Sequence, residues 1–188
     1  ISAGGSSGAR VTPTRDIRIE DVTCTGNRRQ GLTIGRSRHV RVLRSHFIAT
    51  RGTLPGCGID IEPDPGDSAE DIAIEACTLR GNHGAGLQVY ARGRRITVRR
   101  CDIRGNRGDG VLIREGEQCV IEDNDIVGNG LRGIAVRGGR GITVVDNRFA
   151  DNATGLRRQR SQDIKGWMHV DVAKTAQDVR VDRSNRFE

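Results

Sequence analysis

The chain has 188 residues, of which 35% are hydrophobic and 3% aromatic, and it carries a formal net charge of +7. One domain accounts for this length, no apolar run is long enough to span a membrane, and the few aromatic side chains offer almost no stacking surface for nucleic-acid bases. We therefore expect a single domain without membrane insertion, whose ligand is not a nucleic acid.

Residues 1–14 include a Gly/Ser-rich stretch at 2–8, and we expect them to form an N-terminal extension. The chain begins with Ile1 and shows no charged and apolar leader pattern. We expect it to be a fragment or a mature form of a longer protein.

A repeated cassette fills residues 15–160. Each copy has two pairs of alternating apolar residues, then Gly-Asn, then a Gly followed by two more alternating apolar residues. The first copy contains Ile17, Ile19, Val22, Cys24, Gly26, Asn27, Gly31, Leu32 and Ile34. The second covers residues 40–61 and has four extra residues before Gly58. The next four copies begin at Ile72, Ile96, Cys119 and Ile142.

This pattern predicts a stacked array. Alternating apolar residues indicate short strands with one face toward a core, and Gly and Asn permit left-handed turns between the strands. Apart from the longer step after the second copy, successive copies are 23 or 24 residues apart. This period is typical of coils stacked in a solenoid with parallel sheets along its sides. Residues 161–188 hold an irregular segment with Trp167 and a decayed last coil, which we expect to cap the end.

The cassette resembles the right-handed parallel β-helix proteins of the pectin-lyase-like superfamily, over about residues 15–160. Stacked Asn residues at one turn are familiar in that family. Here one register contains Asn27, Asn82, Asn106, Asn129 and Asn152, with Thr50 in the remaining copy. We expect their amides to link successive coils. The fold that the resemblance implies is all-β, a single-stranded right-handed parallel β-helix solenoid of about six to seven coils.

The five cysteines are Cys24, Cys57, Cys77, Cys101 and Cys119. They form no CxxC pair, which leaves a zinc site little support, and we expect them to be small core residues. Strand spacing places Cys77 and Cys101 about 5 Å apart, within reach of a disulfide. The sequence leaves their oxidation state open.

The strand after the repeated Gly carries the candidate site. If its first apolar residue points inward, the next residue points outward. One outward column then contains Thr33, Asp60, Gln88, Leu112 and Ala135, and a second contains Gly35, Glu62, Tyr90, Arg114 and Arg137. We expect Asp60 and Glu62 to share a solvent-facing surface with Gln88 and Tyr90.

The acidic segment at residues 58–67, where the repeat is most disturbed, places Asp64 in a Pro-rich loop. Clustered carboxylates can act as general acid and base or hold a hard cation such as calcium. Asp60, Glu62 and Asp64 are therefore the candidate catalytic residues, and calcium is the candidate cofactor. A competing interpretation makes Asp60 and Glu62 the soluble face of a strand that is paired with arginines.

Only Lys165 and Lys174 among the 31 basic residues are lysines. Arginine binds carboxylate and sulfate through a planar fork, so this surface suits an acidic polymer. The alternative is that the arginines reflect genome composition and solubility.

The resemblance makes a polysaccharide the leading ligand, because the superfamily includes polysaccharide lyases, glycoside hydrolases, uronate epimerases and tailspike-like proteins. It also favours an extracellular or cell-surface location. The Asp-Pro-His signature of mannuronan epimerases is absent, since Pro63-Asp64 has the first two residues in reverse order and no adjacent His.

We therefore expect a carbohydrate-active protein, either a polysaccharide lyase or a glycoside hydrolase. Its expected substrate-binding residues are Gln88, Tyr90, Arg92, Arg114, Arg137 and His83. The alternative is a non-catalytic structural or adhesion module. The sequence leaves metal dependence open, as well as the choice between a monomer and a homo-oligomer.

Overall fold

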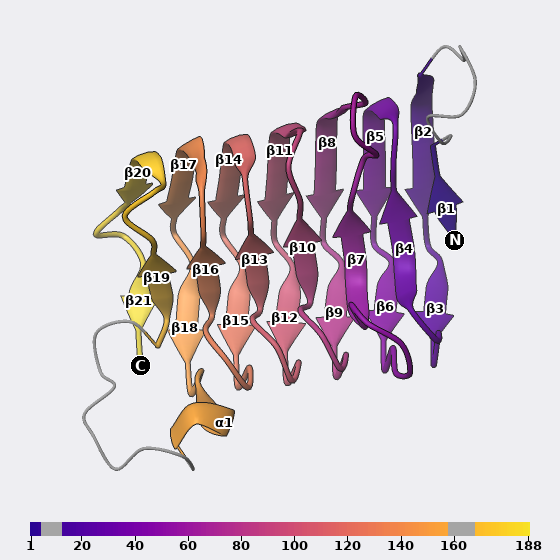
Figure 1. Cartoon of the computed structure of the whole chain (residues 1–188). Coiled ribbons are helices and arrows are strands. Elements are labelled where there is room, and N and C mark those ends of the chain that lie inside the picture. Colours follow the sequence, from indigo (N-terminus) through magenta and orange to yellow (C-terminus); the bar gives the residue numbers. More distant parts are fainter. Residues whose placement is uncertain (5–12, 158–167) are drawn as a thin grey trace.

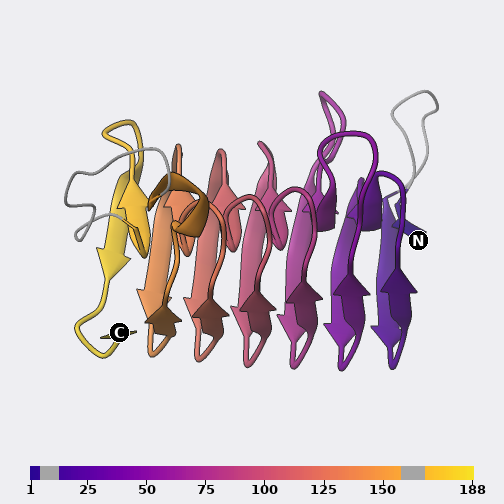
Figure 2. The same ribbon diagram turned by 90° about the horizontal axis from the view of Figure 1, so that it is seen from below.

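The chain forms a row of stacked coils, seen side by side in Figure 1 and from below in Figure 2. The computed structural model describes residues 1–4, 13–157 and 168–188. Each coil contributes one strand to each of three sheets, and every sheet has seven strands paired in parallel. The predicted parallel β-helix is therefore confirmed.

The three sheets follow one another around each coil. Sheet 1 contains β1 (Ser2–Ala3), β4 (Gln30–Ile34), β7 (Cys57–Ile61), β10 (Leu87–Val89), β13 (Val111–Ile113), β16 (Ile134–Val136) and β19 (Val170–Val172). Sheet 2 contains β2 (Thr14–Glu20), β5 (Ser37–Leu43), β8 (Ala69–Glu75), β11 (Gly93–Arg99), β14 (Gly116–Glu122), β17 (Gly139–Val145) and β20 (Gln177–Val181). Sheet 3 contains β3 (Thr23–Thr25), β6 (His46–Ile48), β9 (Thr78–Arg80), β12 (Asp102–Arg104), β15 (Asp125–Val127), β18 (Arg148–Ala150) and β21 (Arg186–Phe187).

The core is a column of aliphatic side chains inside the coils. Ile59, Leu87 and Val111 pair in register across β7, β10 and β13, and all three are fully buried. The glycine before each of them is required by close packing of the coils, because a Cβ at Gly86 would lie 2.8 Å from the carbonyl oxygen of Gly110. The repeated Gly is thus a packing requirement of the stack.

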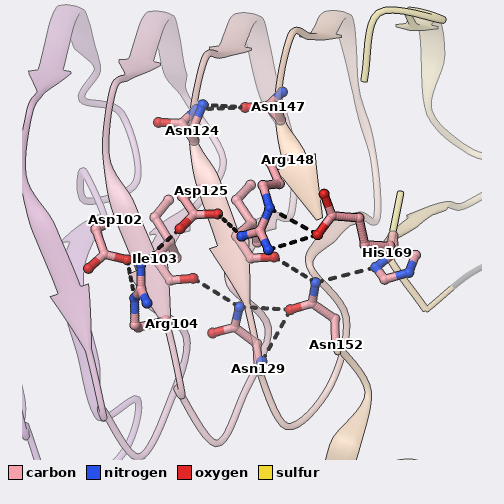
Figure 3. A network of polar contacts seen from close by, with 12 residues as sticks. Asp102, Ile103, Arg104, Asn124, Asp125, Asn129, Asn147, Arg148, Asn152 and His169 are labelled. Atoms are coloured by element: carbon pink, nitrogen blue, oxygen red, sulfur yellow. Dashed lines mark hydrogen bonds and ion pairs between the residues drawn. The ribbon is translucent and has the colours of Figure 1, made fainter. Parts of the chain in front are cut away.

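A ladder of buried asparagines joins the coils between sheets 3 and 1. The Nδ2 of Asn82 donates to the Oδ1 of Asn106 at 2.9 Å, and Asn106 and Asn129 continue the series in the same way. Figure 3 shows its far end, where Nδ2 of Asn152 lies 3.3 Å from Nδ1 of His169. The expected linking role is confirmed for the amides of Asn82, Asn106 and Asn129.

Thr50 interrupts this ladder, as the sequence predicts. Its backbone N–H donates to Oδ1 of Asn82 at 3.0 Å. Within the described part of the chain, however, Oγ1 of Thr50 and Nδ2 of Asn27 have no hydrogen-bond partner. A buried polar atom without a partner lowers stability.

We expect Thr50→Asn to raise the free energy of unfolding by about 1 kcal/mol, because the new amide can accept from Asn27 and complete the ladder. Urea denaturation measures the change. Thr25→Asn, on an exposed strand position, is the control and should have little effect. A Thr50→Asn variant no more stable than the wild type would contradict the prediction.

All five cysteines are buried and are free thiols. Cys77 and Cys101 belong to a second column of polar side chains, between sheets 2 and 3, which continues as Asn124 and Asn147. The Sγ of Cys101 contacts the carbonyl oxygen of Ile74 at 3.7 Å, the kind of carbonyl to which Nδ2 of Asn124 donates in the next coil. These thiols therefore occupy the place of a ladder amide.

Both ends of the chain differ from the predicted boundaries. Residues 2–3 do not belong to an extension, because β1 pairs with β4 and opens sheet 1. In the sixth coil, the cassette pattern places Gly155 and Leu156 at the entry to a strand, but they lie in the short helix α1 (Thr154–Arg157), and β19 takes the strand position by pairing with β16. Residues 168–188 therefore contain a regular last coil. The segment with Trp167, expected to act as a cap, lies outside the described residues.

The outer faces of sheets 2 and 3 are covered by ion pairs. On sheet 3, Arg148 bridges Asp125 at 2.7 Å and Glu188 at 2.8 Å, and Arg104 contacts Asp125 at 2.8 Å; Figure 3 shows this network. On sheet 2, Arg99 pairs with Glu75 at 2.7 Å. These arginines therefore form ion pairs between neighbouring strands on the surface of the solenoid.

Candidate functional site

The two outward columns predicted on sheet 1 exist in the predicted register. Asp60 pairs with Thr33 on one side and with Gln88 on the other, and the column continues through Leu112 and Ala135. Backbone bonds fix the second column, since the N–H of Tyr90 donates to Ile61 and that of Arg114 donates to Val89. Neighbouring coils therefore bring the acidic and basic candidates onto one face.

Asp60 is not on the solvent-facing surface, contrary to the expectation from its strand position. Its exposed fraction is 0%. The Nε2 of Gln30 donates to Oδ2 at 2.9 Å and the Nε2 of Gln88 donates to Oδ1 at 3.1 Å. Gln88 is itself 6% exposed, so its amide serves Asp60, and both side chains lie beneath the surface that a substrate can reach.

Burial raises the pKa of the Asp60 carboxyl to about 6. The Gln30 amide opposes the rise, while the neighbouring Glu62 carboxyl, which also hydrogen-bonds to Asp60, adds to it. Asp60 and Glu62 thus form a carboxyl pair in which one member is buried and the other reaches solvent. A carboxyl that titrates near pH 6 can hold or release a proton close to neutral pH.

This pKa predicts a pH-dependent stability difference between the wild type and Asp60→Asn. A pKa raised in the folded state gives stability that is fully present below the unfolded value and is lost as the pH rises through about 6. From about pH 4 to pH 7, Asp60→Asn should therefore gain about 2 kcal/mol relative to the wild type. Urea denaturation across this range measures the difference.

Glu75→Gln is the control for this prediction. The bound Arg99 lowers the pKa of Glu75, so the wild-type advantage at that position is lost as the pH falls, which is the opposite sign. A flat difference between wild type and Asp60→Asn would show that Asp60 does not titrate near pH 6.

Glu62 and Asp64 line a hollow of about 310 Å³ at the N-terminal end of sheet 1, together with Arg29 and Thr33. The side chain of Glu62 is 34% exposed, and its Oε2 lies 3.6 Å from Nη2 of Arg29. Arg29 also donates from Nε to the carbonyl of Leu54, in the insertion of the second coil, at 3.3 Å. Of the three predicted catalytic carboxyls, Glu62 and Asp64 are accessible here.

Tyr90 and Arg114 lie next along the second column. Tyr90 is 36% exposed, and the guanidinium carbon of Arg114 lies 5.3 Å from the centre of its ring, a cation–π contact. Arg137, one coil further on, pairs with Asp171 through Nη1 at 2.8 Å. Tyr90 and Arg114 therefore present an exposed aromatic and cationic surface beside Glu62, whereas Arg137 is engaged by a carboxylate.

Two predicted binding residues lie elsewhere. Arg92 donates from Nη2 to the carbonyl of Pro63 at 2.8 Å, so it holds the acidic loop in place. His83 precedes β10 while Tyr90 follows that strand, so the two residues lie at opposite ends of β10. His83 lies on the turn next to Gly56. Neither side chain joins the hollow at Glu62.

Sequence reasoning missed the residues that precede the repeated Gly. Gln30, Asp109 and Arg132 occupy this position in their coils, and backbone bonds align Asp109 with Arg132. Arg132 reaches Asp171 at 2.7 Å, and burial raises the pKa of Asp109. Sequence reasoning assigned only the residues after the Gly to the outer face. The signal that could have revealed the others is the polar residue before the Gly in three of the coils.

The described residues contain no group of three or more His, Cys, Asp or Glu side chains arranged to hold a metal ion. Asp60, Glu62 and Asp64 therefore do not form such a group, and calcium stays a prediction from the sequence. In the same part of the chain, no helix is long and apolar enough to cross a membrane.

Comparison with known proteins shows the family. The chain matches the family model described as a right handed beta helix region over residues 1–100 and 91–165. It therefore belongs to the right-handed β-helix family. No curated protein matches the sequence significantly.

Solved structures with the same fold include the periplasmic alginate epimerase AlgG, with a TM-score of 0.63 and 13% identity over 89% of this chain. A point mutant of AlgG has a TM-score of 0.66 and 16% identity over 94% of this chain. The A-module of the Azotobacter vinelandii mannuronan C-5 epimerase AlgE6 has a TM-score of 0.58 and 14% identity over 93%. The chain spans 40%, 45% and 57% of these three structures, respectively.

Proposed function

We propose that the chain binds an acidic polysaccharide along the outer face of sheet 1 and acts on it by proton abstraction, with Glu62 as the catalytic base. The observation that carries the proposal is the Asp60–Glu62 pair. Its accessible member lies between a guanidinium on one coil and an exposed phenol on the next. Such a pair can take up a proton near neutral pH, because Asp60 has a pKa of about 6.

The charges beside Glu62 suit a uronic acid. A guanidinium binds a carboxylate through two parallel hydrogen bonds, and Arg114 extends over Tyr90 toward the substrate side of the sheet. Neutralising a uronate carboxylate makes the hydrogen on the adjacent ring carbon more acidic. The arginines themselves do not serve as the base, because arginine stays protonated in proteins.

In the proposed elimination, Glu62 takes the proton from the carbon next to the uronate carboxylate. The electron pair of that C–H bond forms a ring double bond, and the glycosidic C–O bond breaks. The departing oxygen takes a proton from the Tyr90 hydroxyl, which occupies the next position in the column of Glu62. One chain with an unsaturated end and one chain with a new hydroxyl are formed.

Hydrolysis fits the site less well. It requires two carboxyls that both reach the glycosidic bond from opposite sides, and Asp60 is fully buried. Three solved structures with the same fold are those of epimerases of alginate or mannuronan. Epimerisation of a uronate begins with the same proton abstraction as elimination, which supports this class of chemistry.

The test is to incubate the purified chain with alginate, polygalacturonate and a neutral glucan. Ultraviolet absorbance of unsaturated ends reports elimination, reducing ends without that absorbance report hydrolysis, and exchange of the abstracted proton with deuterated water reports epimerisation. Unsaturated ends from an acidic polymer are the expected result. Reducing ends alone would contradict proton abstraction.

The second candidate is a non-catalytic module that binds the same polymer. The full burial of Asp60 favours it, because only one member of the carboxyl pair can meet a substrate. Binding of a polyuronate without any product or proton exchange would identify this function.

A further inference from the structure

Four basic side chains form a row along the edge between sheets 3 and 1. Each residue of this basic ridge, Arg28, Arg51, His83 and Arg107, directly follows the ladder residue of its coil. Backbone bonds hold the register, since Arg51 N–H donates to Asn27, His83 N–H to Thr50 and Arg107 N–H to Asn82, at 2.8, 2.9 and 2.8 Å. All four side chains are exposed. The ridge therefore presents one basic group on each of four successive coils.

The ridge differs from the other arginine-rich surfaces of the molecule. On sheets 2 and 3, Arg95, Arg99 and Arg148 are each held by carboxylates at 2.5 to 2.9 Å. Within the described ranges, no ion pair with a carboxylate forms at Arg28, Arg51, His83 or Arg107. The positive charge of this edge is left available to a ligand.

The ridge ends at a hollow of about 370 Å³. Arg107 lines it together with Asn106, Thr154 and four glycines: Gly105, Gly128, Gly130 and Gly155. Gly130 continues the ridge register and cannot carry a side chain, since a Cβ there would lie 2.4 Å from the carbonyl of Arg107. The row of basic side chains thus leads into a space bordered by glycines, Asn106 and the hydroxyl of Thr154.

We propose that the basic ridge and this hollow bind a linear acidic polysaccharide that runs along the solenoid axis. Coils are spaced by about 4.8 Å, which is close to the length of one sugar unit, so that one carboxylate or sulfate per sugar can meet one guanidinium or imidazole per coil. The proposal deepens the proposed function and rests on it for the class of substrate, but it assigns a surface outside the Glu62 site.

The chemistry favours a polysaccharide over a nucleic acid. Single-stranded nucleic acids are held by aromatic platforms on which bases stack, and the residues of the ridge and the hollow include no phenylalanine, tyrosine or tryptophan. Guanidinium groups, backbone groups and a hydroxyl can instead bind carboxylates and sugar hydroxyls.

The experiment compares two triple variants of equal charge, both in a Glu62→Gln background so that no substrate is consumed. The ridge variant carries Arg28→Gln, Arg51→Gln and Arg107→Gln. The control carries Arg15→Gln, Arg140→Gln and Arg183→Gln, which are exposed positions outside the ridge. Titration calorimetry measures binding of an oligogalacturonate long enough to span four coils, of an uncharged oligosaccharide and of a single-stranded DNA of similar length.

We expect the ridge variant to bind the oligogalacturonate about tenfold more weakly than the control variant at low salt. Equal binding by the two variants would show that the basic ridge does not bind the polysaccharide. Tighter binding of the DNA than of the oligogalacturonate would overturn the ligand class. Turnover of a polyuronate by the wild type, together with equal binding by the two variants, would refute binding at the ridge but not the proposed enzyme activity. Ridge-dependent binding without turnover would refute the enzyme activity but not binding at the ridge.

Discussion

Replacing Glu62 by glutamine is expected to lower turnover of an acidic polysaccharide by at least about a hundredfold, because a positioned general base contributes about 10²–10⁴-fold. The amide keeps the size of the side chain but cannot take up the substrate proton. Arg114 and Tyr90 keep their cation–π contact, so binding of the polymer should change little. Initial rates from unsaturated ends and calorimetric binding of the same polymer measure the two effects.

Glu122→Gln is the matched control for Glu62→Gln. Glu122 ends β14 on sheet 2, where it lies 4.0 Å from Arg99. The same chemical change is made there on another face of the solenoid. Turnover near the wild-type level in Glu122→Gln and its loss in Glu62→Gln would locate the base. Undiminished turnover in Glu62→Gln, with unchanged circular dichroism in both variants, would remove Glu62 from the mechanism.

The stacking of the coils is predictable from the sequence. Once one residue of a strand is aligned with its partner in the next coil, the pairing of the neighbouring residues is determined as well. Once Leu87 and Val111 are placed inward, Gln88 and Leu112 must share the outer column, as their pairing shows. The Asn register is equally direct, because the same side chain recurs at the same turn. Local periodicity therefore predicts the strands, the ladder and the order of the outward residues.

Burial on the outer face is harder to predict, because it depends on side chains from other coils. Strand alternation places Asp60 outward but does not show that Gln30 and Gln88 reach over from the coils on either side. Burial raises the pKa of this carboxyl, while the hydrogen bonds from the two amides lower it and only partly offset the burial. The hydrogen bonds that define the site link neighbouring coils, whereas the sequence pattern describes one coil at a time.

Departures from the repeat limit prediction in a different way. Gly155 and Leu156 have the residue types of a strand entry, but residues 153–169 separate the sixth ladder position from β19, and Thr154–Arg157 form α1. A pattern that fits the cassette can thus occur inside an insertion. For His83, the sequence predicts the position on a turn. It does not predict that the neighbouring basic side chains of this edge lack carboxylate partners.

Asn106→Ala is expected to lower the free energy of unfolding by about 4 kcal/mol, a large part of the stability of an ordinary domain. The Oδ1 of Asn106 accepts from the backbone N–H of Asn82 at 3.1 Å, and its Nδ2 donates to the carbonyl of Leu79 at 3.0 Å. Alanine leaves both backbone groups buried without these bonds. Urea denaturation measures the loss.

The same substitution at Asn27 provides the control, because its Nδ2 already lacks a partner in the described part of the chain. Asn27→Ala should cost less than about 1 kcal/mol, since it leaves no new buried donor behind. Equal losses at Asn27 and Asn106 would show that the amide ladder does not hold the coils together. In a solenoid, each coil is stabilised mainly by its neighbours, so a break at Asn106, in the middle of the stack, weakens the coils on both sides at once. The ladder that stabilises the solenoid in this way also sets the position of the basic ridge, because each ridge residue directly follows a ladder residue.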